Sequence, residues 1–556
     1  MAGMRLSVSG MDSRVRQTAV YMMLWLVAMT LPAQNLVFLE HSDVLAFDRE
    51  RLPDAQILRG DVRFRHEEAL MFCDSAYFYE KSNSVTAFGH VRFLQGDTLS
   101  GYGDRLYYDG NTRLARLCRH VRLIHRSTTL TTDSLNYDRN TDLAYYFTGG
   151  TIQDSLNLLQ SVWGQYCTAT NQALFRKDVH LQNERFTFDT DTLLYNTKTS
   201  LAQIVCPTVI VYDTVTTILS SNGSYNTDSE QSVLYDRSLI THNDGKQLTA
   251  DTIFYNKKTG YGRLLHNIEL RDTAQHLTLY GHFGEAWEEN KRGYVTDSAH
   301  LIECSEADNP SYVHADTLYT QQIPYTDTLG QDTSYQQITA WHHVRAYNRD
   351  YQLVCDSLSA NSRDSIAVLH RSPVCWADSN QVSADSITLY FVNNRLHHIY
   401  GVGAAFGTRQ INDTCFDQMA GKEMWAWLND STVYKVDVTG NAQTVFYPKE
   451  DDGSLIGVNT TQSSFIQIFL ENRKIDHILF TTATQGVLYP LDQVSKKERF
   501  LGGYFWAEAE RPLSPDDIFR MPPRTERPRQ QTVSATEDIG DTPPAPSKSN
   551  QLRHSR

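Results

Sequence analysis

The sequence repeats one short phrase, an aspartate followed in most copies by serine or threonine, at a regular spacing. The aspartates of its eight copies are Asp74, Asp104, Asp133, Asp191, Asp251, Asp316, Asp356 and Asp385. Their separations are 30, 29, 58, 60, 65, 40 and 29 residues, so the early copies lie one or two units of about 30 residues apart. A period of this size predicts stacked supersecondary units, none of which buries its apolar face alone.

A second phrase follows the same period. The segments "GDVRF", "GHVRF", "RHVRL" and "KDVHL" place Val62, Val91, Val121 and Val179 at separations of 29, 30 and 58 residues. Because the two phrases are independent and share one spacing, the repeat is secure.

The repeating unit has the pattern of short β-strands. In "GHVRFLQGDTLSGYGDRLYYDGNT", apolar Val91 and Phe93 alternate with polar Arg92. The turn slot is filled by "DGNT", "DRNT", "NTKT" or "NKKT", and Asn, Asp and Gly tolerate the backbone of tight turns. The predicted fold class is therefore all-β, with short strands stacked at regular intervals.

The composition along the chain predicts five segments. Residues 1–33 have the basic start, apolar run and small residue before a cut that are typical of a cleaved signal peptide. Residues 34–230 and 231–420 carry the repeats, residues 421–511 form a less regular C-terminal β domain, and residues 512–556, rich in proline, form a disordered tail. The signal peptide predicts an extracytoplasmic protein.

The net charge and the absence of known motifs from the sequence argue against several classes of function. The net charge of −14 argues against a nucleic-acid binder, which needs basic surface to neutralise phosphates. Neither a nucleophile elbow, a phosphate-binding loop nor a zinc helix is present in the sequence. Eight cysteines leave two alternatives, a disulfide framework or small half-buried strand residues. We expect no enzyme activity, no cofactor and no metal site.

The repeated aspartates are better explained by architecture than by catalysis. A catalytic aspartate is needed once, in a unique environment, whereas this phrase recurs along the chain. We interpret the eight aspartates as corner residues, whose carboxylates and neighbouring hydroxyls bond local groups where a strand bends. The adjacent pairs His342–His343 and His397–His398 are expected to be half-buried strand residues, since neighbours in a strand point to opposite faces.

One face of the array is predicted to be apolar and internal. The residues assigned to it are Val62, Phe64, Val91, Phe93, Leu106, Val121, Leu123, Leu135 and Leu193. If two walls of strands close over this face it is only a core, and if they splay it is a groove for acyl chains. The first and last strands would offer unpaired amides for the addition of a partner strand.

The phrases "GDVRF", "TDSLNYDRNT" and "ADTIFYNKKTG" resemble the OstA-like, LptA-type family of lipopolysaccharide-transport proteins, in its long form. The resemblance covers roughly residues 36–512. It implies a β-jellyroll, or "β-taco", of stacked V-shaped strands in the periplasm, whose interior shields the acyl chains of lipid A. It also implies strand addition to an inner-membrane LptC-like partner and an outer-membrane LptD-like partner, with lipopolysaccharide as ligand.

Two other functions remain open from the sequence. A structural or adhesive extracytoplasmic β-solenoid would use the repeats only for length. A polysaccharide-acting enzyme on a β-helix would require carboxylates gathered in one cleft.

Overall fold

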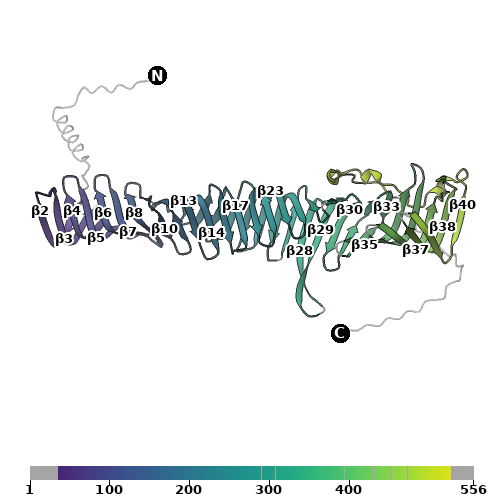
Figure 1. Ribbon diagram of the computed structural model, residues 1–556, viewed down its shortest axis with the longest axis horizontal. Coiled ribbons are helices and arrows are strands. Elements are labelled where there is room, and N and C mark those ends of the chain that lie inside the picture. Colours follow the sequence, from purple (N-terminus) through teal and green to yellow (C-terminus); the bar gives the residue numbers. More distant parts are fainter. Residues whose placement is uncertain are drawn as a thin grey trace, which may run out of the picture. The chain divides into compact units, whose positions relative to one another are not determined.

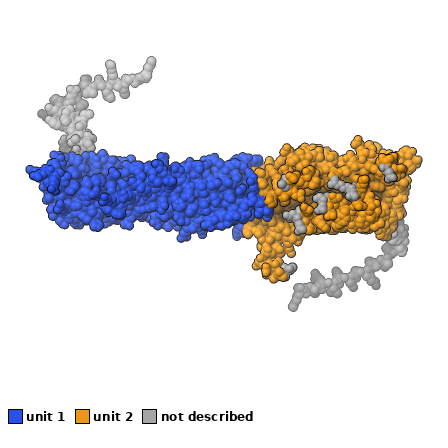
Figure 2. All heavy atoms as spheres, in the orientation of Figure 1, with its two compact units in different colours: residues 1–275, 282–289 blue, residues 276–281, 290–556 orange. Residues whose placement is uncertain are grey.

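The computed structural model describes residues 36–527, except residues 290, 307, 328, 393–394, 430–431, 451 and 472–473. The predicted signal peptide, residues 1–33, lies outside the described residues. The chain forms two compact units (Figure 2). Unit 1 holds the described residues up to Gln275 and His282–Glu289, and unit 2 holds His276–Gly281 and the described residues from Lys291 onward. Both units are built from antiparallel strands, so the all-β prediction is confirmed.

Unit 1 is a succession of antiparallel hairpins (Figure 1). Its strands are β1 (Phe38–His41), β2 (Val44–Asp48), β3 (Leu52–His66), β4 (Ala69–Tyr79), β5 (Ser84–Gln95), β6 (Leu99–Asp109), β7 (Leu114–His125), β8 (Thr128–Asp138), β9 (Leu143–Tyr146), β10 (Gly150–Gln153), β11 (Leu158–Ser161), β12 (Trp163–Cys167), β13 (Gln172–Gln182), β14 (Phe186–Asn196), β15 (Leu201–Ile204), β16 (Thr208–Tyr212), β17 (Thr216–Ser220), β18 (Gly223–Asn226), β19 (Gln231–Leu234), β20 (Ser238–His242), β21 (Lys246–Ala250), β22 (Thr252–Asn256) and β23 (Tyr261–Asp272). Strand β24 (Leu277–Trp287) is divided between the units.

The pairings of unit 1 define two sheets that share their long strands. Strands β3 to β8, β13, β14 and β23 bend once and contribute one half to each sheet. The short strands of sheet A are β2, β9, β12, β15, β18, β19 and β22. Those of sheet B are β1, β10, β11, β16, β17, β20 and β21. Each rung of unit 1 is thus a V with its vertex at the bend.

In β3, β5, β7, β13 and β23 the bend is made by two consecutive residues with left-handed backbone. In β5 these are Gly89 (φ +76°) and His90 (φ +42°), and in β7 they are Arg119 (φ +63°) and His120 (φ +49°). The strand register shifts at the same points. An extra residue in this conformation interrupts the ladder and redirects the strand, which is the action of a β-bulge. The second repeated phrase therefore begins with the bend itself.

Gly89 shows why glycine occupies some of these positions. A Cβ at Gly89 would lie 2.4 Å from the Oδ2 atom of Asp74 on the neighbouring strand. This spacing leaves no room for a side chain beside the aspartate, and the positive φ adds backbone strain for any other residue.

Unit 2 repeats the architecture. Its further elements are β25 (Arg292–Thr296), β26 (His300–Glu303), β27 (Ser311–His314), β28 (Thr317–Thr326), β29 (Asp332–Tyr347), β30 (Gln352–Asn361), β31 (Ile366–His370), β32 (Val374–Ala377), β33 (Asn380–Ser383), β34 (Ser386–Val392), β35 (Arg395–Gln410), β36 (Phe416–Asn429), β37 (Thr432–Phe446), β38 (Val458–Glu471), β39 (Lys474–Thr481), β40 (Gln485–Tyr489), α2 (Lys496–Arg499), η1 (Glu508–Glu510) and η2 (Pro515–Phe519). Its bent strands again carry left-handed pairs, such as His342 and His343. We call the sheet that contains β27, β32 and β33 sheet D.

Residues 495–527, here called the strap, run back over the outer face of sheet D. Gln418 donates through Nε2 to the carbonyl of Arg499 (2.8 Å) and accepts from the amide of Leu501 (2.9 Å). Gln381 bonds the strap in the same way, donating to the carbonyl of Phe505 (3.0 Å) and accepting from the amide of Ala507 (2.8 Å).

The strap also covers an apolar cluster. Phe505 and Ala507 pack with Val354, Val374 and Trp376 of sheet D. The sequence predicted a disordered tail from residue 512, but η2 and its bonds to Arg345 place folded structure beyond that boundary. The prediction of disorder rested on the composition of this proline-rich segment. Composition does not show which apolar and polar side chains find partners on sheet D and hold the segment in place. The remainder of the predicted tail, residues 528–556, lies outside the described residues.

The bend geometry predicts a steric and backbone cost at Gly89. We expect Gly89→Ala to lower the free energy of unfolding of unit 1 by about 1–3 kcal/mol, because it adds both the clash with Asp74 and the left-handed strain. Gly96→Ala is the matched control, since Gly96 has φ +56° but no atom lies within 4 Å of the place that a Cβ would take. Urea unfolding followed by tryptophan fluorescence measures both. Equal losses would contradict the role of the aspartate contact.

The strap contacts predict a local loss when Gln381 is replaced. Gln381→Leu leaves a buried carbonyl and amide without partners, at a cost of about 1–3 kcal/mol. We expect faster hydrogen exchange at Ala507 and faster proteolysis of the strap, with the strands of unit 1 unchanged. Gln462→Leu, which removes an exposed glutamine bonded to Asn441, is the control. An unaltered rate of hydrogen exchange at Ala507 in Gln381→Leu would show that the bonds of Gln381 do not hold the strap in place.

Candidate functional site

The apolar face predicted from the sequence forms the interior between sheets A and B. The nine residues are Val62, Phe64, Val91, Phe93, Leu106, Val121, Leu123, Leu135 and Leu193, and none is more than 2% exposed. Burial of each such side chain contributes about 1.5–3 kcal/mol. In this structure the two sheets close over the interior, so it is packed as a core.

The eight repeated aspartates all lie at or beside the bends. Asp74, Asp104, Asp133, Asp191 and Asp356 fall inside the register shifts of their strands. Asp251, Asp316 and Asp385 follow the ends of short strands, and their amides donate to the carbonyls of the left-handed residues His266, His342 and Gly403. The structure thus distributes these carboxylates along the array and does not gather them in one cleft.

Side chains from neighbouring strands bond several of these carboxylates, and one of them is Asn267, whose Nδ2 donates to Asp251 (2.6 Å). The Nδ1 atoms of His90 and His120 lie 2.7 and 2.9 Å from Asp74 and Asp104. His343 makes the same contact with Asp316 (2.9 Å). His342 and His343 lie in strand β29, as expected, but the expectation that they are half-buried is wrong, because both are exposed bend residues with positive φ. Exposed pairs of this kind contribute little to stability.

A row of polar side chains closes the V of unit 1 at the side opposite the bends. There, the turns of sheet A and those of sheet B meet, and we call this side the mouth. We define the seam as the residues that bond across it: His66, Glu67, Gln95, His125, Asp154, Asn157, Arg185 and Tyr212 from sheet B, and Tyr108, Arg113, Arg139, Asp142, Tyr166, Tyr195, Thr227 and Glu230 from sheet A.

The first group of the seam is an ion-pair network. His66 Nδ1 and the Tyr108 hydroxyl share a hydrogen bond of 2.5 Å, and Arg139 donates to the same hydroxyl (2.8 Å). The carboxylate of Glu67 bonds both Arg113 and Arg139, the second at 3.4 Å. Burial raises the pKa of Tyr108, so its hydroxyl keeps its proton. One carboxylate of sheet B thus bonds two guanidinium groups of sheet A.

The second group consists of buried tyrosines. His125 Nδ1 lies 2.8 Å from the Tyr166 hydroxyl. The Tyr195 hydroxyl donates to Asp154 (2.8 Å) and accepts from Asn157 (3.0 Å). Burial keeps the pKa of both tyrosines above the ordinary value, so both hydroxyls remain neutral partners.

The third group is more exposed. Arg185 of sheet B bonds Glu230 of sheet A at 3.3 Å, and the Tyr212 hydroxyl donates to the same carboxylate (3.4 Å). The ammonium of Lys257 lies 5.4 Å from the centre of the Tyr212 ring. The seam therefore extends over most of the length of unit 1.

The seam was not predicted, although the sequence carries a signal for it. The phrase around the repeated aspartate ends in tyrosine in "DRLYYD", "DSLNYD" and "DTLLYN", which places Tyr108, Tyr137 and Tyr195 at the mouth. A tyrosine buries its ring in the interior and brings its hydroxyl to the polar edge. The 30 tyrosines of the chain are in part explained by this recurring position.

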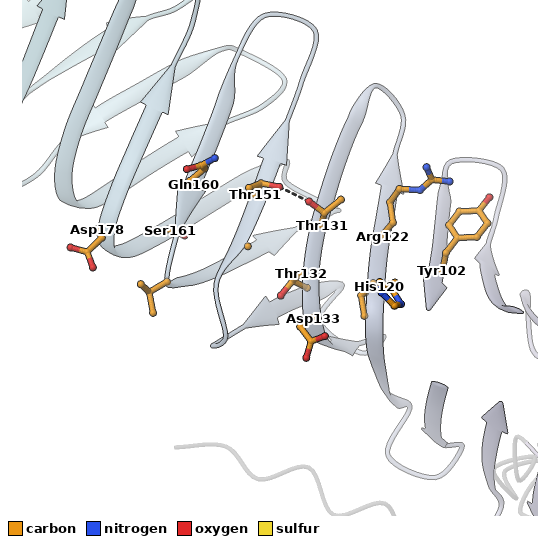
Figure 3. A pocket seen from close by; sticks show the side chains of 13 residues that line it. Tyr102, His120, Arg122, Thr131, Thr132, Asp133, Thr151, Gln160, Ser161 and Asp178 are labelled. Carbon is orange, nitrogen blue, oxygen red and sulfur yellow. Dashed lines mark hydrogen bonds between the residues drawn. The ribbon is translucent and has the colours of Figure 1, made fainter. Parts of the chain in front are cut away.

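A shallow cavity lies on the other face of sheet B (Figure 3). It has a volume of about 960 Å³ and is lined by Tyr102, Arg122, Thr131, Thr151 and Gln160 along neighbouring strands, with His120, Asp133 and Asp178 near the bends. The hydroxyls of Thr131 and Thr151 bond each other. Most of the side chains that line this cavity are polar, unlike those of the apolar interior behind the same strands.

The remaining expectations concern cysteines, metals and membranes. All eight cysteines are free, which favours the alternative of small strand residues over a disulfide framework. Burial raises the pKa of the Cys73 thiol to about 12. Within residues 36–527 and their stated gaps, we find no cluster of three or more potential metal ligands. The described part of the chain also contains no helix long and apolar enough to cross a membrane.

Comparisons with known proteins give one family and one solved structure of note. Residues 34–191 match the family model described as OstA-like protein. No curated protein matches the chain. The crystal structure of LptH from Pseudomonas aeruginosa, described as the LptA-homologous periplasmic component of the lipopolysaccharide transport device, is similar over 25% of this chain and 95% of its own, with 16% identity and a TM-score of 0.21.

The seam predicts a pH dependence centred on His125. Burial, with a smaller effect of Arg126, lowers the pKa of His125 below its ordinary 6.5, so the folded state binds fewer protons than the unfolded state. We expect the stability of unit 1 to fall as the pH drops from 6.5 through this lowered pKa, and His125→Gln to remove that part of the dependence.

His90 is the control for this prediction, because its pKa is shifted in the opposite direction. Asp74 raises the pKa of His90 at a bend. The contribution of His90 to the stability of unit 1 is therefore present at low pH and is lost as the pH rises through the raised pKa. Urea unfolding at pH 5 to 8 of His125→Gln and His90→Gln measures both effects. Identical pH profiles of the two variants would contradict the assignment.

Proposed function

We propose that the chain is a periplasmic component of lipopolysaccharide transport, because residues 34–191 match the OstA-like family model. It would bind the acyl chains of lipid A between sheets A and B and shield them from water. The proposal requires no catalytic step.

The observation that carries the proposal is the continuous apolar interior of unit 1. Its side chains come from successive rungs, from Val62 to Leu193, and face one another across the two sheets. An acyl chain removed from water gains about 0.8 kcal/mol for each buried methylene group, so an interior of this length suits several long chains. The polar mouth would leave the sugar and phosphate groups of the lipid in water.

The proposal also assigns partners at the two ends. The first strands expose Phe38, Val44 and Phe47, and the last expose Leu479, Val487 and Leu488. Exposed apolar side chains on terminal strands are suited to the addition of further strands. We place an inner-membrane LptC-like component and an outer-membrane LptD-like component at these ends.

Site-specific crosslinking tests the ligand and its location. A photoreactive benzoylphenylalanine at Phe93 faces the interior, whereas at Arg92, its neighbour in β5, it faces outward. We expect irradiation in intact cells to crosslink lipopolysaccharide to position 93 and not to position 92. Equal crosslinking at both positions, or none at 93, would contradict the proposed function.

A further inference from the structure

The closed interior of unit 1 raises the question of how a ligand enters. The nine interior residues are at most 2% exposed, so acyl chains fit between the sheets only after the sheets separate. At the bends the sheets are joined by continuous strands and cannot part. At the mouth they are joined by side chains of the seam, by the bond from the Val37 amide of sheet B to the Asn83 side chain of sheet A (2.7 Å), and by interior packing.

The seam is suited to opening. A neutral hydrogen bond typically contributes only about 0.5–1.5 kcal/mol to the stability of a closed structure, because water replaces the partner when the bond breaks. A seam of apolar residues would instead expose new apolar surface at the mouth on opening. The polar seam thus holds the mouth closed while keeping the open state accessible.

The network of Glu67 shows what an incoming ligand would replace. Its carboxylate bonds Arg113 and Arg139, and the side chain of Arg139 is only 6% exposed. Guanidinium groups bind carboxylate and phosphate through the same paired geometry. A lipid with its acyl chains between the sheets would hold its head group at the mouth, where these two arginines lie.

We infer that the seam is a gate, opened when an anionic group of the lipid, such as a phosphate, takes the place of Glu67 on Arg113 and Arg139. This inference rests on the proposed function and adds the route of entry and the group that is recognised. Glu67 closes the gate in the absence of ligand because it satisfies both arginines from the opposite sheet.

The test compares three variants of the full mature chain with two lipids. The lipids are diphosphorylated lipid A and its dephosphorylated form, each presented in detergent micelles. We expect Glu67→Gln to take up the diphosphorylated lipid about tenfold faster than wild type, since the loss of a charged hydrogen bond changes an equilibrium by about this factor. Glu40→Gln is the matched control, because Glu40 pairs with Arg65 (2.6 Å) within sheet B and does not cross the mouth.

The third variant tests recognition. In Arg113→Gln/Arg139→Gln we expect the preference for the phosphorylated lipid to disappear. Equal uptake rates in Glu67→Gln and Glu40→Gln, or a preference for phosphate that survives in the double variant, would overturn the gate. Uptake of neither lipid by the wild-type protein would instead contradict the proposed function itself.

Discussion

Each strand of the array carries an apolar face that no single sheet can bury, and the rest of the structure depends on this constraint. Unit 1 satisfies it by bending its long strands, so that two halves of one strand belong to facing sheets. The bend needs two left-handed residues, such as Gly89 and His90, and an aspartate on the adjacent strand. The repeat period is the chain length needed to complete such rungs, and this explains why both repeated phrases keep the same spacing.

The bend leaves the opposite side of the V exposed to water, and the chain uses polar chemistry there. In unit 1 the turns of the two sheets are joined by tyrosines, histidines and ion pairs whose apolar parts lie inside. In unit 2 a different surface is protected, since the strap covers the outer face of sheet D and binds it through Gln381 and Gln418. Under the proposed function, a packed interior with a polar closure combines a stable resting state with a site for lipid.

The sequence predicts the features that depend on local spacing. The alternation of Val91, Arg92 and Phe93 separates apolar from polar positions, and in the structure the apolar positions are buried, while the repeated aspartates mark the bends. The seam depends on contacts between sheets. Its partners lie at varied separations that are not multiples of the repeat, such as 41 residues in His125–Tyr166, 45 in Arg185–Glu230 and 72 in Glu67–Arg139. Local patterns do not reveal such an offset. The same limitation applies to the strap, because its position depends on contacts 124 to 126 residues away at Gln381.

Under this proposal, lipid enters between sheets A and B when the mouth opens. The direct measurement is the distance between spin labels on facing turns of the mouth, at Ser127 in sheet B and Thr170 in sheet A, introduced as unnatural amino acids so that the eight cysteines stay unlabelled. We predict that the distance increases when diphosphorylated lipid A is added and stays constant with detergent alone. An unchanged distance in protein that has bound the lipid would contradict the claim.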